Sequence, residues 1–141
     1  MAEWKYKKLK GKNMMSLYNY LQNYFHNKDT YMVHKFTEYN IKKYVDEFTI
    51  GNYRLGNKDV NENPIYIGRS DTNLQSRLLQ HLSDRNKYEF FSFKIASSKE
   101  DAYIQECKDF HIFYKSITNK IHPDKPNKMN NVHCPVKNCS N

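Results

Sequence analysis

The chain has 141 residues, the size of a single domain, and 15% of them are aromatic, including twelve Tyr and eight Phe. This content supports a packed core and argues against disorder of the whole chain. No apolar run is long enough to span a membrane, and the start lacks the apolar stretch of a secretory signal. We therefore expect an intracellular, cytoplasmic protein without a membrane partner.

The net charge of +8 is unevenly distributed along the chain. Residues 1–50 and 115–141 each carry an excess of four positive charges, whereas 51–114 carry nine basic and nine acidic residues. Basic flanks suit a polyanionic partner, because each neutralised phosphate releases counterions. Lysine-rich ends that only keep a protein soluble are an equally good explanation.

The first 50 residues predict two helices behind a basic lead-in. Apolar residues recur at helical spacing over 14–25 and again over 41–48, where Thr37 is the expected cap. A short strand is expected over 31–36 between the two helices. We interpret 1–50 as an N-terminal two-helix extension of the central module.

Residues 51–96 predict three strands and one helix. Two strands are expected within 51–69, joined by the polar loop 57–63, with Pro64 at the entry of the second strand. Ser70 and Asp71 are expected to cap a helix that runs to about residue 84. Residues 88–96 alternate loosely and predict a third strand.

A second central helix follows, and then a tail. Ser97 and Glu100 have the spacing of a capping box, which predicts a helix of about eighteen residues that ends before Asn119. The remainder contains Pro123, Pro126 and Pro135 and shows little periodicity, so an extended tail is expected.

The first central helix carries a pair of basic side chains. Arg77 and His81 are four residues apart and project together along one edge of the leucine stripe of this helix. An exposed basic pair beside a core face is the commoner explanation of such spacing. A phosphate clamp is the functional one, because the planar guanidinium fits phosphate oxygens.

The second central helix carries a carboxylate inside its apolar face. Glu106 lies in the middle of an arc that includes Ala102, Tyr103, Phe110 and Phe113. Burying a lone carboxylate is costly, so Glu106 must be paired, protonated or bound to a metal. Both a buried salt bridge and a metal ligand remain open.

Two tyrosines lie in the first two predicted strands. Tyr66 points away from Ile65 and Ile67, on the face that also holds Gly68, where another backbone or a ligand can approach closely. Tyrosines in such positions, Tyr53 included, usually serve packing.

Taken together, the segments GNY (51–53), YIG (66–68), RLLQH (77–81), Glu106 and NKIHPDKP (119–126) resemble the signature of the GIY-YIG nuclease family. The likeness covers residues 51–126, and residues 127–141 form a Cys-containing tail. It implies an α+β fold with a small three-stranded sheet, mixed or antiparallel, with an antiparallel hairpin first, between helices.

The resemblance also implies a function, the hydrolysis of DNA phosphodiesters with a divalent ion, Mg²⁺ or Mn²⁺. The resemblance implies a role for each site residue. Tyr53 orients or deprotonates the attacking water, Tyr66 positions that water, and Arg77 stabilises the charge on the phosphoryl group. His81 donates or shuttles a proton, Glu106 binds the metal, and Asn119 holds the site together. Arg69, Lys120 and Lys125 are expected DNA contacts. A nearby metal and arginine would lower the pKa of a catalytic phenol.

One position departs from the family pattern. Asn52 stands where the first motif usually has Ile. A strand Ile normally packs, so Asn52 suggests altered packing or a more exposed edge.

A second metal site is suggested by cysteine and histidine spacing. Cys107 and His111 are four apart on the second central helix, and Cys134 and Cys139 close the tail, so the four could bind Zn²⁺ tetrahedrally. Either His122 or His133 could compete as a ligand. The alternative is that Cys107 is a small core residue and the tail thiols are free.

Three functional hypotheses therefore remain. The first is a metal-dependent DNA endonuclease. The second is a catalytically inactive nucleic-acid-binding module of the same fold. The third, weaker, is a basic structural protein with a zinc-clipped tail.

Overall fold

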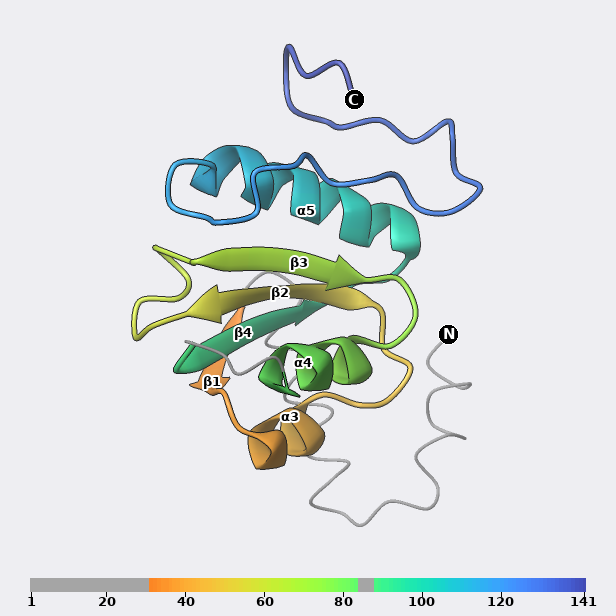
Figure 1. The fold of residues 1–141 in the computed structure, drawn as a ribbon. Helices are drawn as coiled ribbons and strands as arrows, with labels where there is room; N and C mark the ends of the chain where they lie inside the picture. Colours follow the sequence, from red (N-terminus) through yellow and green to blue (C-terminus); the bar gives the residue numbers. More distant parts are fainter. Residues whose placement is uncertain (1–30, 84–87) are drawn as a thin grey trace.

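The computed structural model describes residues 31–83 and 88–141. The helix predicted over 14–25 and the basic lead-in lie outside the described residues. Within them the fold is α+β, with a four-stranded antiparallel sheet and three helices. Helix α5 covers one face of the sheet, and α3 and α4 lie on the opposite side (Figure 1).

The sheet has the strand order β1-β4-β2-β3. Strands β2 (Gly51–Gly56) and β3 (Tyr66–Ser70) form the predicted hairpin, and β4 (Phe90–Ile95) pairs with the other side of β2. Strand β1 (Met32–Lys35) pairs with β4.

The prediction of three strands is therefore wrong. The short strand expected over 31–36 belongs to the sheet, where it covers the outer edge of β4 and pairs backbone groups that would otherwise be open. Its four side chains alternate between half-buried and exposed, and so short an alternation is only a weak sign of a strand in the sequence.

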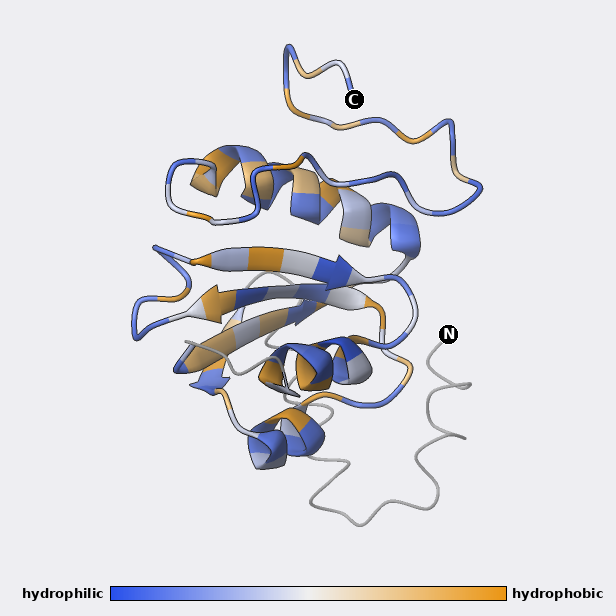
Figure 2. Ribbon diagram, in the orientation of Figure 1, coloured by the Kyte–Doolittle hydropathy of each residue, from blue (hydrophilic) through white to orange (hydrophobic). Residues whose placement is uncertain are grey.

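The two faces of the sheet bury different sets of side chains, as expected from strand alternation. Hydrophobic and hydrophilic residues follow one another along the strands and along α5 (Figure 2). Helices α3 (Glu38–Tyr44) and α4 (Leu74–Ser83) help to enclose the main core. This core contains Phe36, Ile41, Val45, Tyr53, Leu55, Leu74, Leu78, Phe91 and Phe93.

On the other face lies α5 (Lys99–Phe113). It packs on Ile67 of β3 through Phe110, together with Ile117. Asn52 is also on this face and only 1% exposed, and its side-chain amide donates to the Ala102 carbonyl at 2.8 Å. Because β2 is a central strand, the expectation of a more exposed edge at Asn52 is wrong, and the polar side chain instead ties β2 to α5.

Helix caps differ from the prediction at two of three starts. Thr37 caps α3 as expected, accepting from the Asn40 backbone at 3.2 Å. Helix α4 is instead started by Asn73, whose side-chain oxygen accepts from the backbone of Ser76 at 3.0 Å. Ser70 bonds the Asn73 backbone at 3.0 Å and so shapes the turn before the helix.

The α5 cap also shifts by one residue. Ser98, not Ser97, accepts from the Asp101 backbone at 3.1 Å, and the helix has 15 residues. It stops at Phe113 because the chain turns there, with Ile117 N–H bonding back to the Phe113 carbonyl at 3.1 Å.

Residues 114–141 contain no helix or strand and run along the outer side of α5 (Figure 1). The tail contributes Val132 and Cys134 to a small cluster with Tyr103 and Cys107 of α5. Within 31–83 and 88–141, none of the helices has the length and apolar character needed to cross a membrane.

Candidate functional site

Three of the predicted site residues come together on the α4 side of the sheet. The Tyr53 hydroxyl of β2 lies 2.7 Å from Nε2 of His81 on α4. The Tyr66 ring of β3 is centred 4.9 Å from the His81 ring and 6.3 Å from the Tyr53 ring. Two strands and one helix therefore place two phenols around one imidazole.

Gly68 is what lets the Tyr53 ring occupy this place. Strand pairing sets Tyr53 directly opposite Gly68. A Cβ at Gly68 would lie 2.4 Å from the Tyr53 hydroxyl and 2.5 Å from the ring carbon that carries it. A group does approach this glycine closely, but it is the side chain of a tyrosine on the neighbouring strand and not the backbone or ligand that was expected.

Arg77 lies on the exposed side of the same cluster. The Tyr53 phenol is the main reason why the pKa of Arg77 is raised, and Tyr66 contributes less. Nη1 of Arg77 donates to the Gln80 side chain at 3.2 Å. A positive, partly solvated group thus faces the two phenols.

The pKa of Tyr53 moves in the opposite direction to the one expected. Burial of the ring, which is 1% exposed, raises the phenol pKa, and the neighbouring Tyr66 adds to this effect. Arg77 lowers the pKa, but by less than burial raises it. Tyr53 is therefore a neutral hydroxyl at physiological pH, which suits hydrogen bonding better than direct action as a base.

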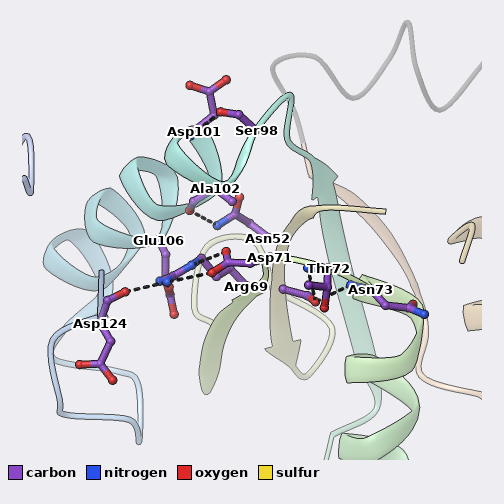
Figure 3. Close-up of polar contacts among 11 residues, drawn as sticks. Asn52, Arg69, Asp71, Thr72, Asn73, Ser98, Asp101, Ala102, Glu106 and Asp124 are labelled. Atoms are coloured by element: carbon purple, nitrogen blue, oxygen red, sulfur yellow. Dashed lines mark hydrogen bonds and ion pairs between the residues drawn. The ribbon is translucent and has the colours of Figure 1, made fainter. Parts of the chain in front are cut away.

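Glu106 lies on the opposite face of the sheet and is paired (Figure 3). Arg69 of β3 donates to Oε2 of Glu106, to Asp71 at 2.8 Å and to the Asp124 carbonyl at 2.6 Å. The side chains of Arg69 and Glu106 are only 11% and 13% exposed. Of the alternatives left open for this carboxylate, the buried salt bridge is present.

The pairing does not fully offset the burial of Glu106. Burial raises the pKa of this carboxyl group, Arg69 lowers it, and the nearby Asp71 and Asp109 raise it further. The net direction is upward, because burial outweighs the effect of Arg69.

The two groups of residues are separated by the sheet but interact electrostatically. Glu106 is among the charges that raise the pKa of Tyr53. Asn119 lies along the free edge of β3, where its amide donates to the Ile67 carbonyl at 2.9 Å and accepts from the Ile67 N–H at 3.4 Å. It bonds the residue next to Gly68 and attaches the segment after α5 to the strand.

The three residues expected to contact DNA all have partners within the protein. Arg69 is engaged by Glu106, Asp71 and Asp124. Nζ of Lys120 donates to the Tyr114 carbonyl and lies 4.6 Å from the centre of the Tyr114 ring. The third, Lys125, lies 3.3 Å from Nδ1 of His133.

A second buried charge network, not predicted from the sequence, lies beside the first. Arg54 of β2 makes a two-pronged contact with Asp109 of α5, at 2.8 and 3.2 Å, and Asp109 is 2% exposed. Tyr31 donates to the same carboxylate at 2.7 Å, and its ring lies 3.7 Å from the Arg54 guanidinium. Asp109 stands three residues after Glu106, on the same helix face, and this spacing was the available signal.

The predicted zinc ligands are brought together with one exchange. His111, Cys134 and Cys139 gather with His122, and their ligand atoms all lie within 4.8 Å of one another. Cys107 is fully buried in the cluster that α5 forms with the tail. The geometry therefore favours His122 over Cys107 as the fourth member.

Comparison of the chain with protein-family models, with curated proteins and with solved structures gives no match.

Proposed function

We propose that this protein is a metal-dependent DNA endonuclease of the GIY-YIG type. One observation carries the proposal: the hydroxyl of Tyr53 lies 2.7 Å from Nε2 of His81, with Tyr66 beside both and Arg77 one helical turn before His81 on α4. A phenol, an imidazole and a nearby guanidinium can orient water, move a proton and stabilise a phosphoryl group.

The proposed chemistry assigns each group a step. Tyr66, half-buried, is the phenol that can reach a water molecule, and His81 beside it takes the proton of that water. The buried Tyr53 hydroxyl, 2.7 Å from Nε2, holds the imidazole in place. An imidazole is a suitable acceptor, because it titrates near neutral pH. Arg77 is exposed and binds the phosphate oxygens as negative charge develops on them.

We assign the divalent cation to Glu106 and Asp71, where it would replace the Arg69 guanidinium. Glu106 and Asp71 converge on one guanidinium, and the pKa of Glu106 is raised by burial in spite of Arg69. Mg²⁺ is commonly bound by one or two carboxylates together with substrate phosphates. An ion held by Glu106 and Asp71 would supply Lewis-acid activation. The phosphate would have to extend past the end of β3 to meet both this ion and Arg77, because Arg77 lies on the other side of the sheet.

The Arg69–Glu106 ion pair favours a second candidate function. Arg69 can neutralise Glu106 in place of a metal, as in a nucleic-acid-binding module that keeps the fold but does not cut. In that case the exposed lysines of the tail would make the contacts with the phosphate backbone. These are Lys115, Lys120, Lys128 and Lys137.

Incubating supercoiled plasmid with the protein and Mg²⁺ separates the two candidates. We expect nicking that falls by a factor of about 10²–10³ in Glu106→Gln and in Arg77→Ala, with DNA binding retained. Matched controls are Glu100→Gln, in the exposed first turn of the same helix, and Lys108→Ala, an exposed cation of α5. Both should nick like the unaltered protein.

Two Tyr→Phe variants give a second comparison of a site residue with a matched control. Tyr53→Phe removes the hydroxyl bonded to His81 and should lower nicking, whereas Tyr103→Phe alters an equally buried tyrosine on the α5 side and should not. DNA binding without nicking by the unaltered protein would rule out the nuclease and leave the binding module. Absence of both activities would rule out both.

A further inference from the structure

Four potential metal ligands converge where the tail crosses α5. They are His111 at the end of α5, His122 in the following loop, and Cys134 and Cys139 in the tail. One ligand atom from each lies within 4.8 Å of all the others. Two imidazoles and two thiols make a donor set that favours zinc over the oxygen-preferring cations.

The distances agree with tetrahedral coordination. Sγ of Cys134 lies 3.6 Å from Nε2 of His111, and Sγ of Cys139 lies 3.5 Å from Nε2 of His122. With Zn–S near 2.3 Å and Zn–N near 2.0 Å, a tetrahedral ion separates sulfur from nitrogen by about 3.6 Å. These side chains thus already have the spacing of zinc ligands.

The hydrogen bonds behind the ligands set the correct donor atoms. Nδ1 of His122 lies 3.0 Å from the Pro123 carbonyl, which can only accept, so the proton is on Nδ1 and the lone pair on Nε2. Nε2 is the atom that faces Cys139. The side-chain amide of Asn141 donates to Sγ of Cys139 at 3.7 Å, which supports a thiolate. Second-shell bonds of this kind are typical of bound imidazoles.

The end of the tail needs such a link because little else holds it. Residues 127–141 lack helix and strand, and the hydrophobic cluster that joins them to α5 has few buried members. Small irregular segments of this kind are often stabilised by a structural metal.

We propose that His111, His122, Cys134 and Cys139 bind one structural Zn²⁺ ion that fastens the tail to α5. The two thiols each lose a proton on binding, and both imidazoles bind as neutral Nε2 donors. The site is closed, with four protein ligands, so its role is structural and not catalytic.

The zinc would also support the region around Glu106. His122 is two residues before Asp124, whose carbonyl accepts from Arg69 at 2.6 Å. Holding His122 in place therefore keeps Asp124 beside Arg69. The proposal stands apart from the nuclease proposal, because zinc binding is measured without any activity.

Metal analysis of the full chain tests the proposal directly. Protein produced with zinc under reducing conditions should contain about one zinc per chain. The content should fall to the level of the buffer in His122→Ala and Cys139→Ala. It should be unchanged in the matched controls His133→Ala, an exposed tail histidine, and Cys107→Ala, a buried cysteine of α5.

Cobalt provides a readout that needs no variant. Titration of the metal-free chain with Co²⁺ should give the visible bands of a tetrahedral ion together with thiolate charge-transfer absorption, and Zn²⁺ should displace it. Absence of zinc and of the cobalt spectrum in the unaltered protein would overturn the proposal. Loss of zinc in Cys107→Ala with retention in His122→Ala would overturn the ligand set. A Cys134–Cys139 disulfide found under non-reducing conditions in place of zinc would overturn the ligand set and the zinc proposal together.

Discussion

Replacing Gly68 by Ala should destabilise the protein through a single steric contact. The added methyl would lie 2.4 Å from the Tyr53 hydroxyl and 2.9 Å from a second ring carbon. The shorter contact is about 1 Å closer than an ordinary van der Waals contact. Tyr53 is 1% exposed and packed on all sides, so its ring has no free space to enter.

The expected cost follows from these contacts. Overpacking of a core costs about 1–3 kcal/mol, and loss of the Tyr53–His81 hydrogen bond adds about 1 kcal/mol. We therefore expect Gly68→Ala to lower the free energy of unfolding by about 2–4 kcal/mol, which corresponds to a fall of about 10 °C in Tm for a chain of this size.

Gly56→Ala is the matched control. It lies in the neighbouring strand, and a Cβ there meets its nearest atoms at 3.4 Å, an ordinary contact. Replacing a glycine without a clash usually stabilises slightly, by about 0.4–1 kcal/mol. Urea unfolding followed by far-UV circular dichroism should separate the two variants clearly.

A double-mutant cycle identifies the cause. In a Tyr53→Ala background the methyl of Gly68→Ala has space, so its cost should fall by at least about 1.5 kcal/mol. Equal midpoints for Gly68→Ala and Gly56→Ala would refute the reasoning, and so would an unchanged cost of Gly68→Ala when Tyr53 is absent.

Other predictions concern buried polar groups. Burial, and to a lesser degree Lys43, lowers the pKa of His34 below its ordinary value near 6.5. The unfolded chain therefore binds more protons than the folded one, and the stability should fall as the pH falls below about 6.5. The variant His34→Phe should show a flatter dependence between pH 5 and 7 in urea titrations, and an unchanged slope would contradict this assignment. Asp109→Ala leaves Arg54 buried without its partner and should cost about 3–5 kcal/mol by thermal unfolding, whereas a cost below about 1 kcal/mol would show the pair to be dispensable. Asn52→Ala removes the hydrogen bond to α5 and should cost about 1–3 kcal/mol in the same assay; a neutral result would mean that the bond contributes nothing.

Much of the secondary structure could be predicted from local pattern. Alternation and turn residues predicted β2, β3 and β4, and leucine spacing predicted α4, because these elements depend on residues close together in the chain. The caps at Ser98 and Asn73 were missed by one to three residues. Several neighbouring Ser, Asn and Asp side chains can accept from a helix start, and the backbone path decides which one does.

The contacts of the candidate site were likewise only partly predictable from the sequence. Helical periodicity was enough to show that Glu106 needs a partner, but Arg69 stands 37 residues earlier on a strand of the opposing layer. Sequence spacing likewise indicated a Cys and His cluster near the end of α5. Whether Cys107 or His122 joins the other three ligands depended on the packing of the tail. His122 gathers with them, whereas Cys107 is buried in the hydrophobic cluster between α5 and the tail.

The order of strands and helices, the need to neutralise Glu106 and the approach to Gly68 all followed from the amino-acid sequence, since each depends on periodicity or on the size of one residue. Tertiary structure decided the pairing of the short first strand with β4, the Arg69 ion pair, the Arg54–Asp109 pair and the four converging ligands. Their partners are distant in the chain, and their distances and burial exist only once the sheet and α5 have packed together.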